Sequence, residues 1–108
     1  MMAVDVTDAN FDDIVMKSEL PVLLDFWAVW CRPCQLLGAS IQKLADNYKG
    51  KVLVGKINID EEPELTERFR VSSIPSVYII QDGVVVERMV GAMPYSELLK
   101  VLETYIKN

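Results

Sequence analysis

Histidine is absent from this chain of 108 residues, and cysteine occurs only 2 times. Without histidine the chain can build neither a Ser-His-Asp triad nor a Cys-His nucleophile pair, so most hydrolase mechanisms lose their base. Two cysteines are too few for a four-cysteine zinc or iron–sulfur site within one chain. The sequence therefore predicts chemistry that two thiols can perform alone, with no bound cofactor and no metal.

Positive charge and long apolar runs are also scarce. The 11 Lys and Arg residues stand against 16 Asp and Glu residues, and the net charge of -5 argues against nucleic acid as a partner. The longest apolar stretch, residues 21–31, is interrupted by Asp25 and is far shorter than the roughly 20 residues that span a bilayer, so we expect no membrane segment. Residues 1–16 contain no Lys or Arg, unlike a secretory signal, and we expect a cytoplasmic protein.

Strands and helices alternate along the chain, and no repeat or linker divides it, which predicts one domain over residues 1–108. Strands are predicted at residues 4–6, 21–28, 52–59, 77–80 and 84–90, with helices at residues 8–16, from the cysteines to before residue 50, at residues 63–69 and from residue 94 onward. The strand at residues 21–28 is apolar on both faces, which predicts a central position. Asp82-Gly83 favours a hairpin between the last two strands, so the pattern predicts an α/β fold with a mixed sheet between helices.

The helix after the cysteines has an apolar stripe and no proline in its middle. Ala39 follows Gly38 in the middle of this helix, and neither residue imposes a kink as proline would. We therefore expect a straight helix. The predicted buried stripe consists of Leu36, Leu37, Ile41, Leu44, Ala45 and Tyr48.

The two cysteines lie in the motif Cys31-Arg-Pro-Cys34. The i, i+3 spacing brings both sulfurs to one face of the first turn of a helix, where a disulfide can close. The positive end of the helix dipole favours the thiolate of Cys31, which would attack a substrate disulfide, whereas Cys34 lies deeper and would resolve the mixed disulfide. A structural disulfide, two core thiols or a metal held between two chains are the alternatives, although so short a loop stabilises a fold by only about 2 kcal/mol.

A series of motifs extends this interpretation. They are Asp25-Phe-Trp-Ala-Val-Trp-Cys-Arg-Pro-Cys34, Lys56-Ile-Asn-Ile-Asp60, Ile74-Pro75, Asp82-Gly83 and Gly91. In the order and spacing of these motifs the chain resembles the thioredoxin family over nearly its whole length. The resemblance implies a thioredoxin fold with a central five-stranded mixed sheet and four helices. It also implies a protein-disulfide reductase that acts on disulfide-containing client proteins and receives electrons from a thioredoxin reductase.

Two other functions remain open beside this one. The protein could be a more oxidising oxidoreductase dedicated to one client, or a thioredoxin-like module that binds a partner protein and whose thiols are incidental. A monomer is the expected state. Arg32 is the residue that bears on the first alternative, because it stands where the family commonly has glycine, and a cation beside Cys31 should stabilise the thiolate and raise the reduction potential. An arginine that is simply solvated would have no such effect.

Asp25 is the one charged residue in the most apolar strand, and burial should raise the pKa of its carboxyl group. The resemblance implies that Asp25 accepts the proton of Cys34, with Lys56 nearby. The alternative is an aspartate at a strand edge that reaches water.

The resemblance further implies a surface that binds substrate around the cysteines. Its residues are Trp30, Arg32, Pro33, Ile59, Ile74, Pro75, Val90, Gly91 and Ala92. The Ile74-Pro75 bond is expected to be cis and to face the cysteines, which would leave the backbone near Ile74 free to pair with an extended substrate segment. A trans proline at the start of a strand is the alternative. Gly91 either lets a substrate backbone approach or merely ends the strand.

Overall fold

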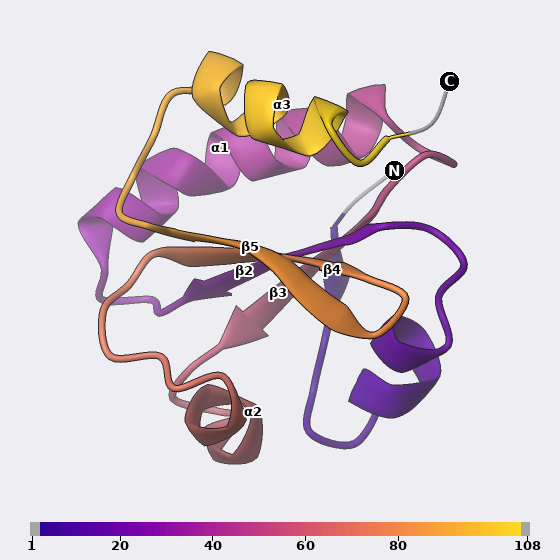
Figure 1. Cartoon of the computed structure of the whole chain (residues 1–108). Helices are drawn as coiled ribbons and strands as arrows, with labels where there is room; N and C mark the ends of the chain where they lie inside the picture. The colour runs from indigo at the N-terminus through magenta and orange to yellow at the C-terminus, as the bar shows by residue number, and fades with distance from the viewer. Residues whose placement is uncertain (1–2, 107–108) are drawn as a thin grey trace.

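The computed structural model describes residues 3–106, and it contains the expected mixed sheet between two layers of helices (Figure 1). The five strands lie side by side in the order β1-β3-β2-β4-β5. The strands are β1 (Val4–Asp5), β2 (Val22–Trp27), β3 (Leu53–Asn58), β4 (Ser76–Gln81) and β5 (Val84–Val90). The helices are the π-helical turn η1 (Asp12–Met16), α1 (Arg32–Asn47), α2 (Pro63–Arg68) and α3 (Tyr95–Glu103).

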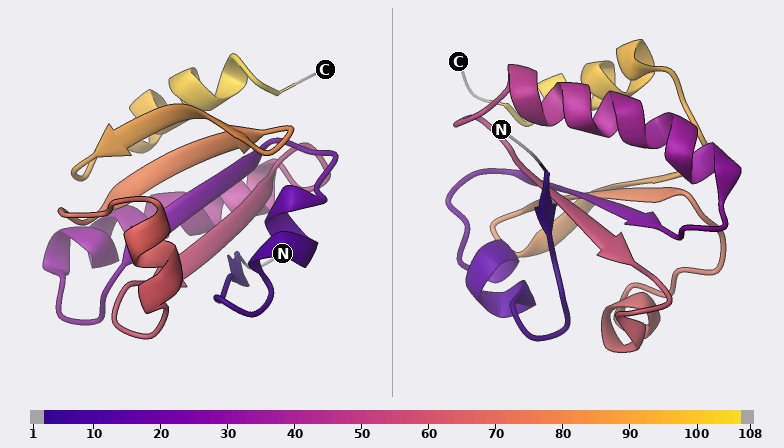
Figure 2. Two further views of the ribbon diagram at one scale, coloured as in Figure 1. Left: turned by 60° about the horizontal axis from the view of Figure 1, so that its bottom comes forward. Right: turned by 180° about the vertical axis from the view of Figure 1, so that it is seen from behind.

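The central position predicted for the strand at residues 21–28 is confirmed. β2 pairs in parallel with β3 and antiparallel with β4, and both of its faces are covered. Helices α1 and α3 lie over one face of the sheet, whereas η1 and α2 lie over the other (Figures 1 and 2). Leu23 packs in the core beneath α1, and Phe26 packs in the core on the opposite face. Because successive side chains of a strand alternate between faces, Asp25 projects to the same side as Leu23.

Helix α1 begins directly after Cys31 and continues without a break through Ala39. Its buried face holds Leu37, Ile41 and Leu44, as the apolar stripe predicted. Leu36 was wrongly included in that stripe, because 64% of it is exposed. Each residue of an α-helix turns by about 100°, so a face centred on Leu37 and Ile41 leaves Leu36 turned toward solvent.

The helix predicted at residues 8–16 is shorter than expected, because residues 8–10 form a turn and η1 covers residues 12–16. Thr7 and Asn10 hold the turn that precedes η1: the Thr7 hydroxyl oxygen accepts the backbone N–H of Asn10 at 3.1 Å, and the Asn10 side-chain oxygen accepts the backbone N–H of Thr7 at 2.7 Å. Asp8 stays outside the helix because its carboxylate accepts the N–H of Leu65 at 2.9 Å, in the first turn of α2.

The hairpin between β4 and β5 is also confirmed. These strands are antiparallel, and Asp82 and Gly83 connect them with φ angles of 53° and 78°. Two positive φ angles characterise the tight turn that matches the twist of a hairpin, which explains the Asp-Gly pair. None of the helices within residues 3–106 has the length and apolar character needed to cross a membrane.

Candidate functional site

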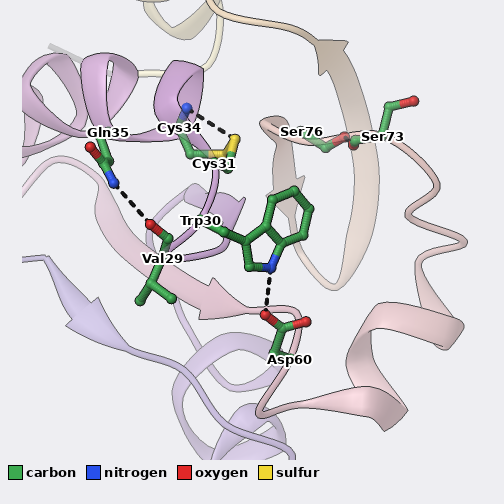
Figure 3. Close-up of a disulfide and its surroundings, with 8 residues drawn as sticks. All are labelled: Val29, Trp30, Cys31, Cys34, Gln35, Asp60, Ser73 and Ser76. Atoms are coloured by element: carbon green, nitrogen blue, oxygen red, sulfur yellow. Dashed lines mark hydrogen bonds between the residues drawn. A yellow bond between two sulfur atoms is a disulfide. The ribbon is translucent and has the colours of Figure 1, made fainter.

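The two cysteines form a disulfide at the junction between β2 and α1, and their Cα atoms are 5.3 Å apart (Figure 3). Cys31 is the N-cap of α1, with an extended backbone, and its sulfur accepts the backbone N–H of Cys34 at 3.2 Å. Cys31 is 5% exposed and Cys34 is 2% exposed. The sulfur of Cys31 therefore lies at the positive end of the helix dipole, where a thiolate is favoured over a thiol.

A small apolar cluster surrounds the disulfide and is separate from the two larger core clusters. It consists of Ala28 and the two cysteines, with Trp27, Ile59 and Ile74 packed against them. Ile59 comes from the end of β3 and Ile74 from the loop before β4, so the fold brings together segments that are far apart in the sequence. Both isoleucines were predicted to lie near the cysteines, and the structure places them there.

Ile74 and Pro75 are joined by a cis peptide bond, as the resemblance implied. The carbonyl oxygen of Pro75 accepts the backbone N–H of Gly91 at 2.8 Å, which connects the loop before β4 with the end of β5. Gly91 has a φ angle of 96°, and no atom lies within 4 Å of the point where a β-carbon would stand. Glycine therefore suits the backbone conformation and leaves open space above it. Val90 and Ala92, on either side, are both exposed.

Trp30 is 67% exposed and is fixed by a hydrogen bond that the sequence did not reveal. Its indole N–H donates to a carboxylate oxygen of Asp60 at 2.8 Å (Figure 3). Asp60 follows β3, and the carboxyl ends of the parallel strands β2 and β3 lie at the same edge of the sheet. Residues that follow two adjacent parallel strands lie close together. This adjacency is the feature from which the contact between Trp30 and Asp60 could have been predicted.

Asp25 is wholly buried in the centre of the sheet, so the alternative of a strand-edge aspartate in water is wrong. Within residues 3–106, neither of its carboxyl oxygens has a hydrogen-bond partner. Burial raises the pKa of Asp25 to about 7, and the positive charge of Lys56 partly opposes this shift. Lys56 is the neighbour of Asp25 in the parallel register, but its ammonium lies 4.6 Å from the centre of the Trp27 ring. The two side chains form no ion pair in the described part of the chain.

Arg32 and Pro33 form the exposed start of α1. Pro33 suits this position because the first N–H groups of a helix have no acceptor within it. No group of three or more His, Cys, Asp or Glu side chains within residues 3–106 is arranged to hold a metal ion. The site thus combines a redox-active pair of sulfurs at a helix start, a buried carboxyl group on the same face of the sheet and an exposed apolar rim.

Comparison with known proteins agrees with this geometry. The family model described as Thioredoxin matches residues 2–104. A thioredoxin of Chlorobaculum thiosulfatiphilum is 43% identical over 102 residues, covering 94% of each chain. A thioredoxin of Synechocystis is 43% identical over 101 residues, and one of Haemophilus influenzae is 39% identical over 101 residues, each with 94% of both chains covered. The chain belongs to the thioredoxin family and is a thiol–disulfide oxidoreductase.

Proposed function

We propose that the protein reduces disulfides in client proteins, with Cys31 as the nucleophile and Cys34 as the resolving thiol. The Cys31 thiolate attacks one client sulfur, which forms a mixed disulfide and releases a client thiolate that takes a proton from water. Cys34 then loses its proton and attacks the Cys31 sulfur, which releases the second client thiolate. Two electrons pass to the client, and the pair is left as the disulfide of this structure. A thioredoxin reductase supplies two electrons to reduce it again.

Asp25 is the proton acceptor in this proposal. A carboxyl group with a pKa of about 7 can take up a proton near neutral pH, and Asp25 lies on the face of the sheet that α1 and Cys34 cover. Its two oxygens have no competing donor within residues 3–106. Lys56 acts through Asp25, because its positive charge limits the rise of the carboxyl pKa and keeps that value close to the working pH.

The exposed rim around the disulfide is the proposed client-binding surface. Open space above Gly91 supports this assignment, and the proposed client segment is extended and pairs with the backbone near Ile74. We assign this surface to Trp30, Arg32, Pro33, Ile59, Ile74, Pro75, Val90, Gly91 and Ala92. The negative net charge and the apolar rim support a protein partner, and we propose that residues 1–108 act as one monomeric cytoplasmic domain that binds neither nucleic acid nor membranes.

The observation that carries the proposal is the position of the Cys31 sulfur as the cap of α1, accepting the Cys34 N–H. The test mixes reduced protein with a dye-labelled peptide disulfide and follows the products by mass. We expect Cys34→Ser to accumulate a mixed disulfide with the peptide, because nothing resolves it, and Cys31→Ser to form none. Accumulation in the Cys31→Ser variant, or in neither variant, would refute the assigned roles.

The direction of electron flow requires a second measurement. Equilibration in glutathione buffers, followed by the fluorescence of Trp27 and Trp30, gives the midpoint of the Cys31–Cys34 couple. We expect a cooperative two-electron transition well below the glutathione potential, as a general reductase requires. A midpoint at or above that potential would instead favour the client-dedicated, more oxidising enzyme, whereas complete function in a Cys31→Ser, Cys34→Ser double variant would favour the binding module.

A further inference from the structure

Arg32 is an exposed cation beside the reactive sulfur. It is the first residue of α1 and follows Cys31 directly. Within residues 3–106, Arg32 forms no ion pair, no side-chain hydrogen bond and no aromatic contact. The first turn of α1 contains no acidic residue. A cation at the N-terminus of a helix is disfavoured by the helix dipole, so the fold gains nothing evident from Arg32.

The residues next to Arg32 in the sequence are mostly apolar. Val29 is 65% exposed and Leu36 is 64% exposed, so the nearby rim is largely apolar. The amide of Gln35 donates to the Val29 carbonyl oxygen at 2.9 Å, and the carboxylate of Asp60 accepts the Trp30 indole N–H (Figure 3). The amide of Gln35 is thus already bonded, whereas Asp60 keeps its negative charge because its partner is a neutral N–H. Arg32 is the one charged residue among those assigned to the client-binding surface, so a client docked on the cysteines meets its positive charge within a largely apolar set of side chains.

We propose that Arg32 determines substrate specificity by favouring client disulfides that have an acidic side chain next to the attacked cysteine. This inference rests on the proposed reductase function. The guanidinium can donate two parallel hydrogen bonds to a carboxylate, which adds geometric selection to the charge attraction. The positive end of the α1 dipole also attracts a carboxylate at this position. The protein as a whole carries net negative charge and repels acidic groups, so we expect the attraction to act only close to this site.

The test compares three cyclic peptide disulfides that differ only in the residue before the first cysteine, which is Glu, Gln or Lys. Pre-reduced protein is mixed with each peptide in a stopped-flow instrument, and the second-order rate of disulfide reduction is measured. The ratio of rates between peptides is the readout. Any effect of Arg32 on the reactivity of Cys31 applies equally to all three peptides and therefore cancels in this ratio.

We expect wild-type protein at low ionic strength to reduce the Glu peptide about 1.5- to fivefold faster than the Gln peptide, and the Lys peptide more slowly, as for an exposed charge pair. In about 1 M salt the ratio should approach one. Arg32→Gln should abolish the preference and Arg32→Glu should invert it. Lys51→Gln is the matched control, because Lys51 is exposed near the start of β3, at the opposite end of the strand from the site, and it should keep the wild-type ratio.

The outcomes separate the two proposals. If reduced wild-type protein reduces none of the peptides, the reductase function itself fails. If it reduces all three at equal rates, or if Arg32→Gln retains the preference, only the role of Arg32 is refuted. If an Arg32 variant does not fold, the salt series on the wild type decides, since a preference that 1 M salt leaves unchanged cannot come from an exposed cation.

Discussion

The buried carboxyl group of Asp25 should make the folded protein less stable as the pH rises through neutrality. Its pKa is about 7 in the folded protein and 3.8 as the ordinary value, so the folded state keeps a proton that the unfolded chain releases. The stability that this proton confers is fully present below pH 3.8 and is lost as the pH rises to about 7. At roughly 1.4 kcal/mol per pKa unit, the total loss is about 4 kcal/mol, a large share of the stability of a small domain.

The assay is urea unfolding of the oxidised protein at intervals from about pH 5 to about pH 8, for the wild type and for Asp25→Asn. Over this range the wild type should lose about 2 to 3 kcal/mol more than the variant, which carries no titrating group at this position. The chain has no histidine, and the disulfide keeps both cysteines from titrating. The terminal amine does titrate in this interval, but the wild type and the variants share it, so it cancels in the comparison. The exposed Asp13→Asn is the matched control and should follow the wild-type profile. Parallel profiles for the wild type and Asp25→Asn would refute the reasoning.

Three further changes probe the groups around the disulfide. Lys56→Gln removes the positive charge that lowers the pKa of Asp25, so this pKa should rise further above its ordinary value. An NMR titration that finds the Asp25 pKa unchanged or lower would contradict this expectation. Arg32→Gly removes the cation that stabilises the Cys31 thiolate, so it should lower the reduction potential by about 10 to 20 mV, where ~30 mV corresponds to 1.4 kcal/mol. A glutathione titration that finds an equal or higher midpoint would count against a role for the charge of Arg32. Gly91→Asn, which uses the side chain that best tolerates a positive φ, should slow reduction of a peptide disulfide several-fold while sparing a small aliphatic disulfide, because its side chain enters the open space above the rim. Equal effects on both substrates would exclude this explanation.

The spacing of apolar residues predicted the strands and most of the helices, because each element must bury one face and its own sequence carries that spacing. The run around Asp25 indicated a central strand, and the Asp82-Gly83 pair indicated the hairpin, before any tertiary contact was known. Leu36 shows the limit of the method, since the spacing of apolar residues does not fix the edge of a buried stripe. A charge within an apolar run likewise predicted the burial of Asp25, and the structure rejected the remaining alternative of a strand edge that reaches water.

Contacts between distant segments were beyond that local signal. Asp8 caps α2 across 57 positions of sequence, and Trp30 bonds to Asp60 across 30 positions. Each depends on how loops meet at the edges of the sheet, which no spacing along the chain encodes. The head of Lys56 is a similar case, since the register places its backbone beside Asp25, while the side chain extends over Trp27 instead.

The disulfide lies within the first turn of α1 and belongs to a cluster apart from the two main cores. The bridge closes a loop of four residues, so its cross-link contributes only about 2 kcal/mol to folding by the chain-entropy model. The cross-link itself therefore contributes little to the stability of the fold. Substitutions between Cys31 and Cys34 can change the affinity of the pair for electrons while the packing on both faces of the sheet stays intact, and a single fold can serve partners of different redox potential.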